Sequence, residues 1–310
     1  MTLPDRVTVL DVTARDGLQD QPAIVATAGK AALVAALVAS GVTELEVTSF
    51  VHPAWVPQLA DAEALVALLP RTARYSALIM NERGFARALA AFDGAGYARG
   101  SYDLVFVGSA SPRHNRANNN RTIDETLALF ETVAARAHAE NVTIRGAAAC
   151  SFASPWADEH IDVATVCDMA RRFAEGGCTT VTLADTIGKA KPEVVSATIA
   201  AVRAVTGVEL SLHFHDLRGS ALANVHAGLA SGVRRFEAVL SGIGGCPFAP
   251  EAPGNLDLET LHHALTSRGF ETGLDTEKLA AGRAVLTHAL DTATPIVREH
   301  AAAPEAPAVV

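Results

Sequence analysis

The sequence has few cysteines, no long apolar run and no excess of basic charge. Its four cysteines form no CxxC pair, so they indicate neither a zinc site nor a redox motif. No stretch of about 18 apolar residues is free of charges, so we expect no membrane-spanning helix and no membrane partner. The net charge of −9 and the pI near 5.6 lack the basic footprint of nucleic-acid binders. An anionic substrate would therefore need local positive groups.

The N-terminal stretch MTLPDRVTVLDV also lacks the pattern of a secretory signal. It has no cationic segment followed by an apolar stretch and a cleavage site of small residues. A low cysteine content without pairing motifs is typical of reducing compartments. We therefore expect a cytoplasmic protein with free thiols.

Short β-branched runs alternate with longer helical stretches along the 310 residues. The helical stretches include 30–40, 122–140 and 191–205, and the second begins with a capping box formed by Thr122 and Glu125. The eight predicted strands are 7–12, 43–48, 75–80, 102–107, 142–149, 179–184, 208–215 and 234–240. Eight such units predict a (β/α)8 TIM barrel, and a doubly wound open sheet is the alternative.

No linker divides the chain, so we expect one catalytic barrel over residues 1–290. The helical stretch 275–290 follows the eighth unit and is expected to pack outside the barrel. Residues 291–310 are expected to form a partly disordered C-terminal tail, because the end AAAPEAPAVV cannot bury enough apolar surface.

A barrel places its active site at the C-terminal ends of its strands, and polar residues occur there. Arg15 and Asp16 follow the first strand, although an adjacent Arg–Asp pair is also common in solvated turns. Asp185 follows the sixth strand. Glu46 lies within the apolar second strand, where burial is costly unless the carboxylate is paired.

The seventh strand ends in HFHD, residues 213–216. Residues i and i+2 of a strand point to the same face, so His213 and His215 converge while Leu212 and Phe214 face the other way. Two core histidines would give the same pattern. Imidazole is, however, a good ligand for divalent first-row metals, and Asp216 could orient one ring.

The segment SGIGGCPFAPEAPGN, residues 241–255, follows the last strand and contains Cys246 among glycines and prolines. Its glycines allow a loop that closes over a substrate, whereas the alternative role of Cys246 is a buried small apolar residue. In a closed barrel Asp16 and Asn255 can approach the two histidines. The two imidazole nitrogens, together with one oxygen each from Asp16 and Asn255, would form a ligand set that suits Mg²⁺ or Mn²⁺.

Six motifs in order resemble the 3-hydroxy-3-methylglutaryl-CoA lyase family over residues 5–290. They are RDGLQ (15–19), TSFVHPAWVPQ (48–58), NRTIDE (120–125), ADTIG (184–188), HFHD (213–216) and GIGGCPFAPEAPGN (242–255). Single motifs are shared with related Claisen-type synthases, and the GGCP loop followed by GN is the more specific feature.

The resemblance implies a metal-dependent carbon–carbon lyase that cleaves this acyl-CoA to acetoacetate and acetyl-CoA. It implies a Mg²⁺ or Mn²⁺ ion, a homodimer, and a place in leucine degradation and ketone-body formation. The implied metal ligands are Asp16, His213, His215 and Asn255. Arg15 would be the cation at the thioester oxygen, and Cys246 the catalytic residue of the loop. Asp16 or His213 would transfer the proton, and Glu46 and Asp185 would be supporting acidic residues.

Several positions depart from the family pattern, including Pro22, His52, Ala54 and Leu217. None of them is an implied ligand, so they bear on the CoA contacts and the acyl group. A lyase of a related 3-substituted substrate is one alternative. A synthase or aldolase acting on a 2-oxo acid and a catalytically silent barrel are the others. The segment 111–122, read as a loop, carries three arginines that could meet CoA phosphates or only solvent: Arg113, Arg116 and Arg121.

Overall fold

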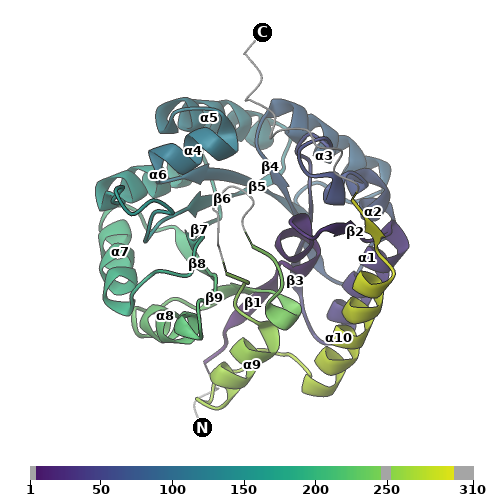
Figure 1. Cartoon of the computed structure of the whole chain (residues 1–310). Coiled ribbons are helices and arrows are strands. Elements are labelled where there is room, and N and C mark those ends of the chain that lie inside the picture. The colour runs from purple at the N-terminus through teal and green to yellow at the C-terminus, as the bar shows by residue number, and fades with distance from the viewer. Residues whose placement is uncertain (1–4, 246–252, 297–310) are drawn as a thin grey trace.

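A closed barrel of eight parallel strands forms the centre of the computed structural model, which describes residues 5–245 and 253–296 (Figure 1). The strands are β1 (Thr8–Asp11), β3 (Glu44–Ser49), β4 (Arg74–Ile79), β5 (Tyr102–Ser109), β6 (Thr143–Ala149), β7 (Thr180–Asp185), β8 (Glu209–Phe214) and β9 (Arg235–Ala238). They pair in this order, and β9 closes on β1. Each predicted strand overlaps one of them, so the predicted (β/α)8 barrel is confirmed and the open sheet is wrong.

Helices surround the barrel in Figure 1. They are α1 (Thr27–Ala39), α2 (Ala62–Leu68), α3 (Glu82–Gly94), α4 (Pro112–Asn119), α5 (Ile123–Ala139), α6 (Val163–Glu175), α7 (Pro192–Val205), α8 (Ser220–Ala230), α9 (Leu258–Thr266) and α10 (Thr276–Asp291). Within the described residues, none of these helices is long and apolar enough to cross a membrane.

Side-chain caps determine where two adjacent helices begin. Thr122 accepts a hydrogen bond from the Glu125 backbone N–H, and the Glu125 carboxylate accepts one from the Thr122 N–H, so the predicted capping box is confirmed. The prediction that 111–122 is a loop is wrong, because these residues contain α4. Ser111 caps α4 and Pro112 occupies its first position, where proline is favourable.

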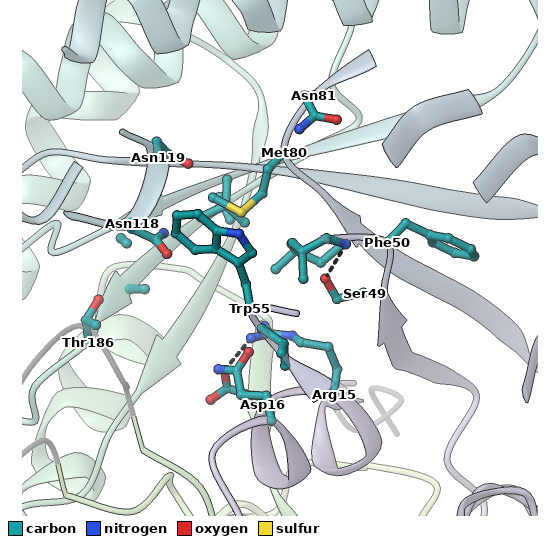
Figure 2. Close-up of a pocket in the computed structure, with 18 of the residues that line it drawn as sticks. Arg15, Asp16, Ser49, Phe50, Trp55, Met80, Asn81, Asn118, Asn119 and Thr186 are labelled. Atoms are coloured by element: carbon teal, nitrogen blue, oxygen red, sulfur yellow. Dashed lines mark hydrogen bonds and ion pairs between the residues drawn. The ribbon is translucent and has the colours of Figure 1, made fainter. Parts of the chain in front are cut away.

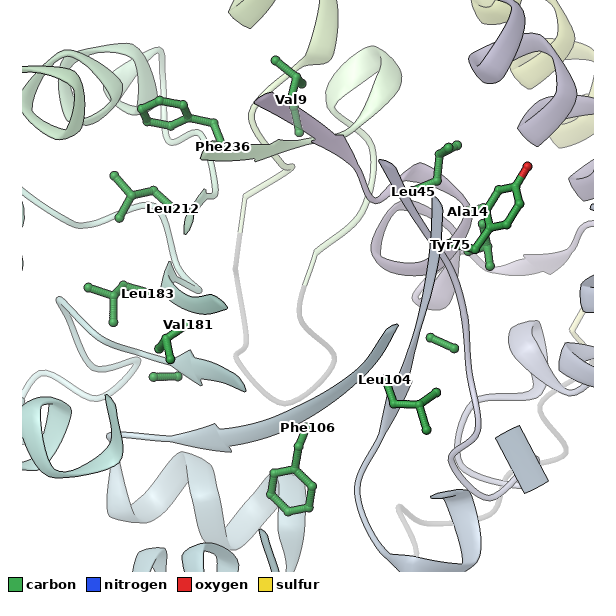
Figure 3. Close-up of a cluster of buried hydrophobic side chains, with 14 of the residues drawn as sticks. Val9, Ala14, Leu45, Tyr75, Leu104, Phe106, Val181, Leu183, Leu212 and Phe236 are labelled. Atoms are coloured by element: carbon green, nitrogen blue, oxygen red, sulfur yellow. The ribbon is translucent and has the colours of Figure 1, made fainter. Parts of the chain in front are cut away.

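The strands alternate between a core face and a barrel-interior face. Figure 3 shows the core side chains Phe106, Leu183, Leu212 and Phe236, each fully buried between the barrel and the helices. Leu212 and Phe214 thus lie on the face opposite to the two histidines, as the period of the strand predicted.

The C-terminal helix α10 packs outside the barrel against α1, as predicted. After α10, the short strand β10 (Thr294–Pro295) pairs antiparallel with β2 (Ala23–Ile24). Most of the predicted tail, residues 297–310, lies outside the described residues.

Asp11 at the end of β1 gives a first testable prediction. Burial raises the pKa of its carboxyl to about 7, although hydrogen bonds from Thr13 act to lower it. The unfolded chain titrates near 4, so ionisation favours the unfolded state and stability falls as pH rises from about 4 to about 7. We expect the stability of the wild type relative to Asp11→Asn to fall by roughly 3 to 4 kcal/mol across this window. Urea unfolding at several pH values measures it, and a pH-independent difference would contradict it.

Candidate active site

The C-terminal ends of the strands open into a cavity of about 650 Å³ (Figure 2). Arg15, Asp16, His213 and His215 all line it. A cavity therefore lies where the site was predicted, at the C-terminal ends of the barrel strands. The segment that follows β9 reaches the cavity at Gly245.

The turn after β1 holds Arg15 and Asp16 in place through a chain of hydrogen bonds. Asp11 accepts bonds from the Thr13 N–H at 2.9 Å and from the Thr13 hydroxyl at 2.6 Å. The Thr13 oxygen in turn accepts a bond from the Leu240 N–H at 2.8 Å. The turn Thr13–Gly17 is thereby fixed to the end of β9 before it projects its two charged side chains.

Asp16, His213 and His215 form a buried cluster whose ligand atoms all lie within 4.8 Å of one another. The Nε2 atom of each imidazole is 3.8 Å from Asp16 Oδ2. Each Nδ1 atom is engaged elsewhere, by Glu237 Oε2 at 3.0 Å for His213 and by the Pro253 carbonyl at 2.8 Å for His215. Both rings thus turn Nε2 toward the carboxylate, which is the arrangement that a metal ion requires.

Asn255 lies beside this cluster, because its backbone forms an isolated antiparallel β-bridge with that of His215. Its Nδ2 donates to Asp16 Oδ2 at 2.9 Å and to the Ile243 carbonyl at 3.0 Å. Its Oδ1 is buried and has no hydrogen-bond partner among the described residues. A buried acceptor without a donor fits a cation, so imidazole, carboxylate and amide donors together suit a divalent metal.

The charges of the cluster are strongly coupled. Burial acts to raise the pKa of Asp16, but Arg15 and the two imidazoles outweigh burial and hold this pKa below its ordinary value. Burial lowers the pKa of His215 to about 4, assisted by His213. Burial also acts to lower the pKa of His213. The hydrogen bond to Glu237 and the charge of Asp16 outweigh burial, so this pKa is raised overall. The carboxylate is therefore ionised at neutral pH and available to a cation.

Arg15 joins the cluster to β3. Its guanidinium forms ion pairs with both Asp16 and Glu46, and Glu46 is 2% exposed. A carboxylate buried in this apolar strand was expected to need a partner, and Arg15 is that partner. Burial nevertheless raises the pKa of Glu46 against the opposing effect of Arg15.

Glu237 on β9 is a site residue that sequence reasoning missed. Besides His213, it accepts a hydrogen bond from the Thr182 hydroxyl at 2.7 Å and pairs with the buried Arg145 at 3.3 Å. The signal was present, because a glutamate inside the apolar run RRFEAVL needs a buried partner as Glu46 does.

Two acidic residues near the site accept hydrogen bonds from backbone N–H groups. Asp185 does not line the cavity; its carboxylate accepts bonds from the N–H groups of Lys189 at 3.1 Å and Ala190 at 2.8 Å. Burial raises its pKa to about 6. The prediction that Asp216 orients an imidazole is wrong, because its carboxylate accepts from the Ala221 N–H at the start of α8.

The remaining predicted residues are placed differently. Cys246 lies outside the described residues, so its catalytic role stays a prediction. Of the three arginines in 111–122, only Arg121 lines the cavity. Arg113 pairs with Asp158 and lies over the ring of Trp156, and Arg116 donates to the Asn120 carbonyl.

Gly244 brings two parts of the site together. It has φ +95, and a Cβ atom there would lie 2.7 Å from the Asp16 carbonyl and 2.8 Å from Asn255 Nδ2. We expect Gly244→Ala to weaken Mn²⁺ binding at least about tenfold, because the added atom separates Asp16 from Asn255. Titration calorimetry measures it. The matched control is Gly207→Ala, where nothing lies within 4 Å, and equal losses in both variants would refute the prediction.

Glu237 should set the orientation of His213. We expect Glu237→Gln to weaken Mn²⁺ binding by about 10- to 100-fold, as is usual when the partner of a metal-binding imidazole is lost. Binding is measured well below the melting temperature, because Arg145 loses its charged partner and the fold is destabilised. Glu209→Gln, at the exposed start of β8, makes the same chemical change away from the cavity. Unchanged affinity in Glu237→Gln would remove this residue from the site.

These features define a (β/α)8 barrel with a candidate divalent-metal centre at its strand ends. Residues 6–286 match the family model HMGL-like, and the chain belongs to this family. Relatives named hydroxymethylglutaryl-CoA lyase include a Pseudomonas mevalonii protein, 35% identical over 88% of this chain and 89% of its own. The human mitochondrial protein of that name is 34% identical over 94% of this chain and 88% of its own.

Solved structures give the same result. The HMG-CoA lyase of Brucella melitensis superposes with a TM-score of 0.85 and 36% identity, covering 93% of this chain and 99% of its own. An HMG-CoA lyase from Acinetobacter baumannii, in complex with coenzyme A and 3-methylmalate, has a TM-score of 0.85 and 33% identity over 98% of both chains. The carboxyl transferase domain of Rhizobium etli pyruvate carboxylase, at 16% identity, shares only the fold.

Proposed function

We propose that the protein is a carbon–carbon lyase that cleaves 3-hydroxy-3-methylglutaryl-CoA to acetoacetate and acetyl-CoA. The observation that carries the proposal is the buried cluster of Asp16, His213 and His215 with Arg15 at its edge, in a chain of the HMGL-like family. Relatives that span most of the chain carry the name of this activity. The coenzyme A in the Acinetobacter structure supports an acyl-CoA substrate.

In this reaction the C2–C3 bond breaks and the 3-hydroxyl becomes the ketone of acetoacetate. The hydroxyl loses a proton, the electron pair of the bond passes to the thioester as an enolate, and C2 then takes up a proton. A divalent ion, Mg²⁺ or Mn²⁺, when held by Asp16, His213, His215 and Asn255, would supply a Lewis acid that makes the hydroxyl more acidic.

The side chains of the site fit the remaining tasks. Asp16 lies 3.8 Å from His213 Nε2, and its carboxylate keeps free lone pairs when it holds a metal, so it can accept the hydroxyl proton. His213 could accept this proton only when its Nε2 is not a metal ligand, because its Nδ1 is bonded to Glu237. Arg15 provides a fixed positive charge for the enolate oxygen, and Glu46 holds its guanidinium in place. Asp185 supports the site indirectly by fixing the backbone after β7. We assign protonation of C2 to Cys246.

The test is an assay of the full chain with this substrate, with and without Mg²⁺ or Mn²⁺, following acetoacetate and acetyl-CoA. We expect cleavage only with metal and a large loss in Cys246→Ala. Cys167→Ala, on α6 away from the cavity, is the matched control. Bound metal without cleavage would overturn the reaction and favour a 2-oxo-acid synthase or a silent barrel. A fully active Cys246→Ala would remove the cysteine from the mechanism.

The quaternary structure and the cellular setting are finer proposals. We propose a homodimer, which light scattering of the purified chain can test directly. The cytoplasmic location and the roles in leucine degradation and ketone-body formation stay predictions.

A further inference from the structure

The cavity has one apolar wall. Strands β4, β5 and β6 lie across the barrel from β8, β9 and β1, respectively, because each is four places from its opposite strand in the closed order. The cavity-lining side chains of these strands and of the residue that follows β4 are Leu78, Met80, Val107, Ala147 and Ala149. None of them carries a charge or a hydrogen-bonding group other than a thioether. In Figure 2, Met80 is drawn on the opposite side of the pocket from Arg15 and Asp16.

Small side chains on β6 leave this wall open. Gly146 faces outward, because a Cβ atom there would lie 2.5 Å from the ring of Phe173 on α6. Arg145, Ala147 and Ala149 therefore point into the barrel. Arg145 fills the bottom and is 2% exposed, whereas the two alanines above it are only partly buried. Bulky branched residues normally fill such interior layers, so this space is unusual for a barrel.

The polar groups of the cavity fix how an acyl group can lie. The hydroxyl and carboxylate of the substrate belong with the cluster of Asp16, His213 and His215, since no other described lining group combines ligands in this way. Exposed polar side chains such as His52 and Arg83 line the cavity at its surface, where the CoA chain can enter. The substituent on C3 is then the part of the substrate left to face the apolar wall. A methyl group would leave much of that wall uncovered.

We propose that this wall is the binding site of the C3 substituent and that the substrate class extends to 3-hydroxy-3-alkylglutaryl-CoA thioesters with chains longer than methyl. The inference rests on the proposed lyase activity. The bond change is the same: the C2–C3 bond breaks, the 3-hydroxyl loses its proton to become the ketone, and C2 gains a proton. The products are acetyl-CoA and a longer 3-oxo acid. Ala147 and Ala149 determine this specificity by leaving room for the chain.

The first experiment compares kcat/KM of the metal-loaded wild type for the 3-methyl, 3-ethyl, 3-propyl and 3-butyl substrates. Each methylene buried against the wall should raise kcat/KM about fourfold, so the propyl substrate should exceed the methyl one by more than about tenfold. A propyl-to-methyl ratio at or below about one would overturn the proposal.

Substitutions then locate the effect. Ala147→Leu and, as a second variant in case the first fails to fold, Ala149→Leu fill the wall. Each should lower the propyl-to-methyl ratio of kcat/KM at least about tenfold. Ala200→Leu makes the same change on the exposed face of α7 and should leave the ratio unchanged. An unchanged ratio in both wall variants would show that the chain binds elsewhere and would refute the assignment.

Binding separates this inference from the proposed reaction. Alkylglutaryl-CoA analogues without the 3-hydroxyl cannot be cleaved, and calorimetry gives their dissociation constants with the wild type. Tighter binding of the propyl than of the methyl analogue would support the wall assignment even if no substrate were cleaved, in which case only the proposed reaction would fail. Cleavage of the methyl substrate with equal binding of both analogues would instead refute the wall assignment and leave the reaction standing.

Discussion

Asp16→Asn is expected to abolish most of the metal binding and activity of the protein. Asp16 is the one carboxylate of the candidate metal cluster, and its Oδ2 faces both imidazole Nε2 atoms at 3.8 Å. Asparagine keeps the shape and one oxygen, but it loses the negative charge that attracts a cation, and its NH₂ group cannot coordinate one. We expect kcat/KM for cleavage to fall by roughly 10³-fold or more, because metal positioning and a proton acceptor are lost together.

Two measurements make this prediction specific. Mn²⁺ titration by calorimetry should show the loss of affinity directly, independent of any substrate. Asp20→Asn is the matched control, because Asp20 lies on the same segment yet does not line the cavity. It should bind Mn²⁺ much as the wild type does. Wild-type affinity in Asp16→Asn would mean that the cluster is not the metal site.

The sequence predicts the barrel and the cluster of Asp16, His213 and His215 because both depend on local patterns. The strands are apolar runs of the right length, and the HxH pattern of β8 fixes the face of His213 and His215 whatever surrounds them. Closure of the barrel then brings β1 beside β9 and so brings Asp16 toward the histidines. The period of the strand and the closed order of the barrel were together sufficient to predict that these residues lie close to one another.

The features that sequence reasoning missed depend on contacts between distant segments. Glu237 was visible as a charge in an apolar strand, but its partners His213, Thr182 and Arg145 come from three other strands. Asp216 directly follows a histidine, which suggested a bond to the ring. Strand β8 ends at Phe214, however, so Asp216 lies in the turn and accepts a hydrogen bond from the Ala221 N–H in the first turn of α8 instead.

The segment containing α4 shows a competition between composition and start signals. Its asparagines and arginines are typical of a loop, which led to the wrong prediction. The Ser-Pro pair at 111–112 is a helix-start signal, and Asn115 reinforces the helix by accepting a bond from the Ser109 N–H and donating to Thr126. Those tertiary bonds cannot be read from the sequence.

Arg15→Gln is expected to reduce kcat by roughly 10²- to 10³-fold, the usual loss when a fixed group that stabilises a developing oxyanion is removed. Unlike Asp16→Asn, it should leave Mn²⁺ affinity equal or increased, because a positive charge beside a cation site has been removed. Arg15→Lys keeps the charge but cannot pair with Asp16 and Glu46 through one planar fork, so its kcat should be intermediate. A fall in Mn²⁺ affinity that parallels the fall in kcat would contradict an oxyanion role.

The partner of Arg15 makes it possible to separate catalysis from folding. Removing Arg15 alone leaves Glu46 buried without its cation, which costs roughly 3 to 5 kcal/mol if the carboxylate stays charged. Part of this cost is avoided because the pKa of Glu46, already raised by burial, rises further and the group is protonated. The double variant Arg15→Gln with Glu46→Gln removes both charges, so its unfolding free energy should recover relative to Arg15→Gln. Its kcat should remain low, because neither amide restores the positive charge; recovery of kcat together with stability would assign Arg15 a purely structural role.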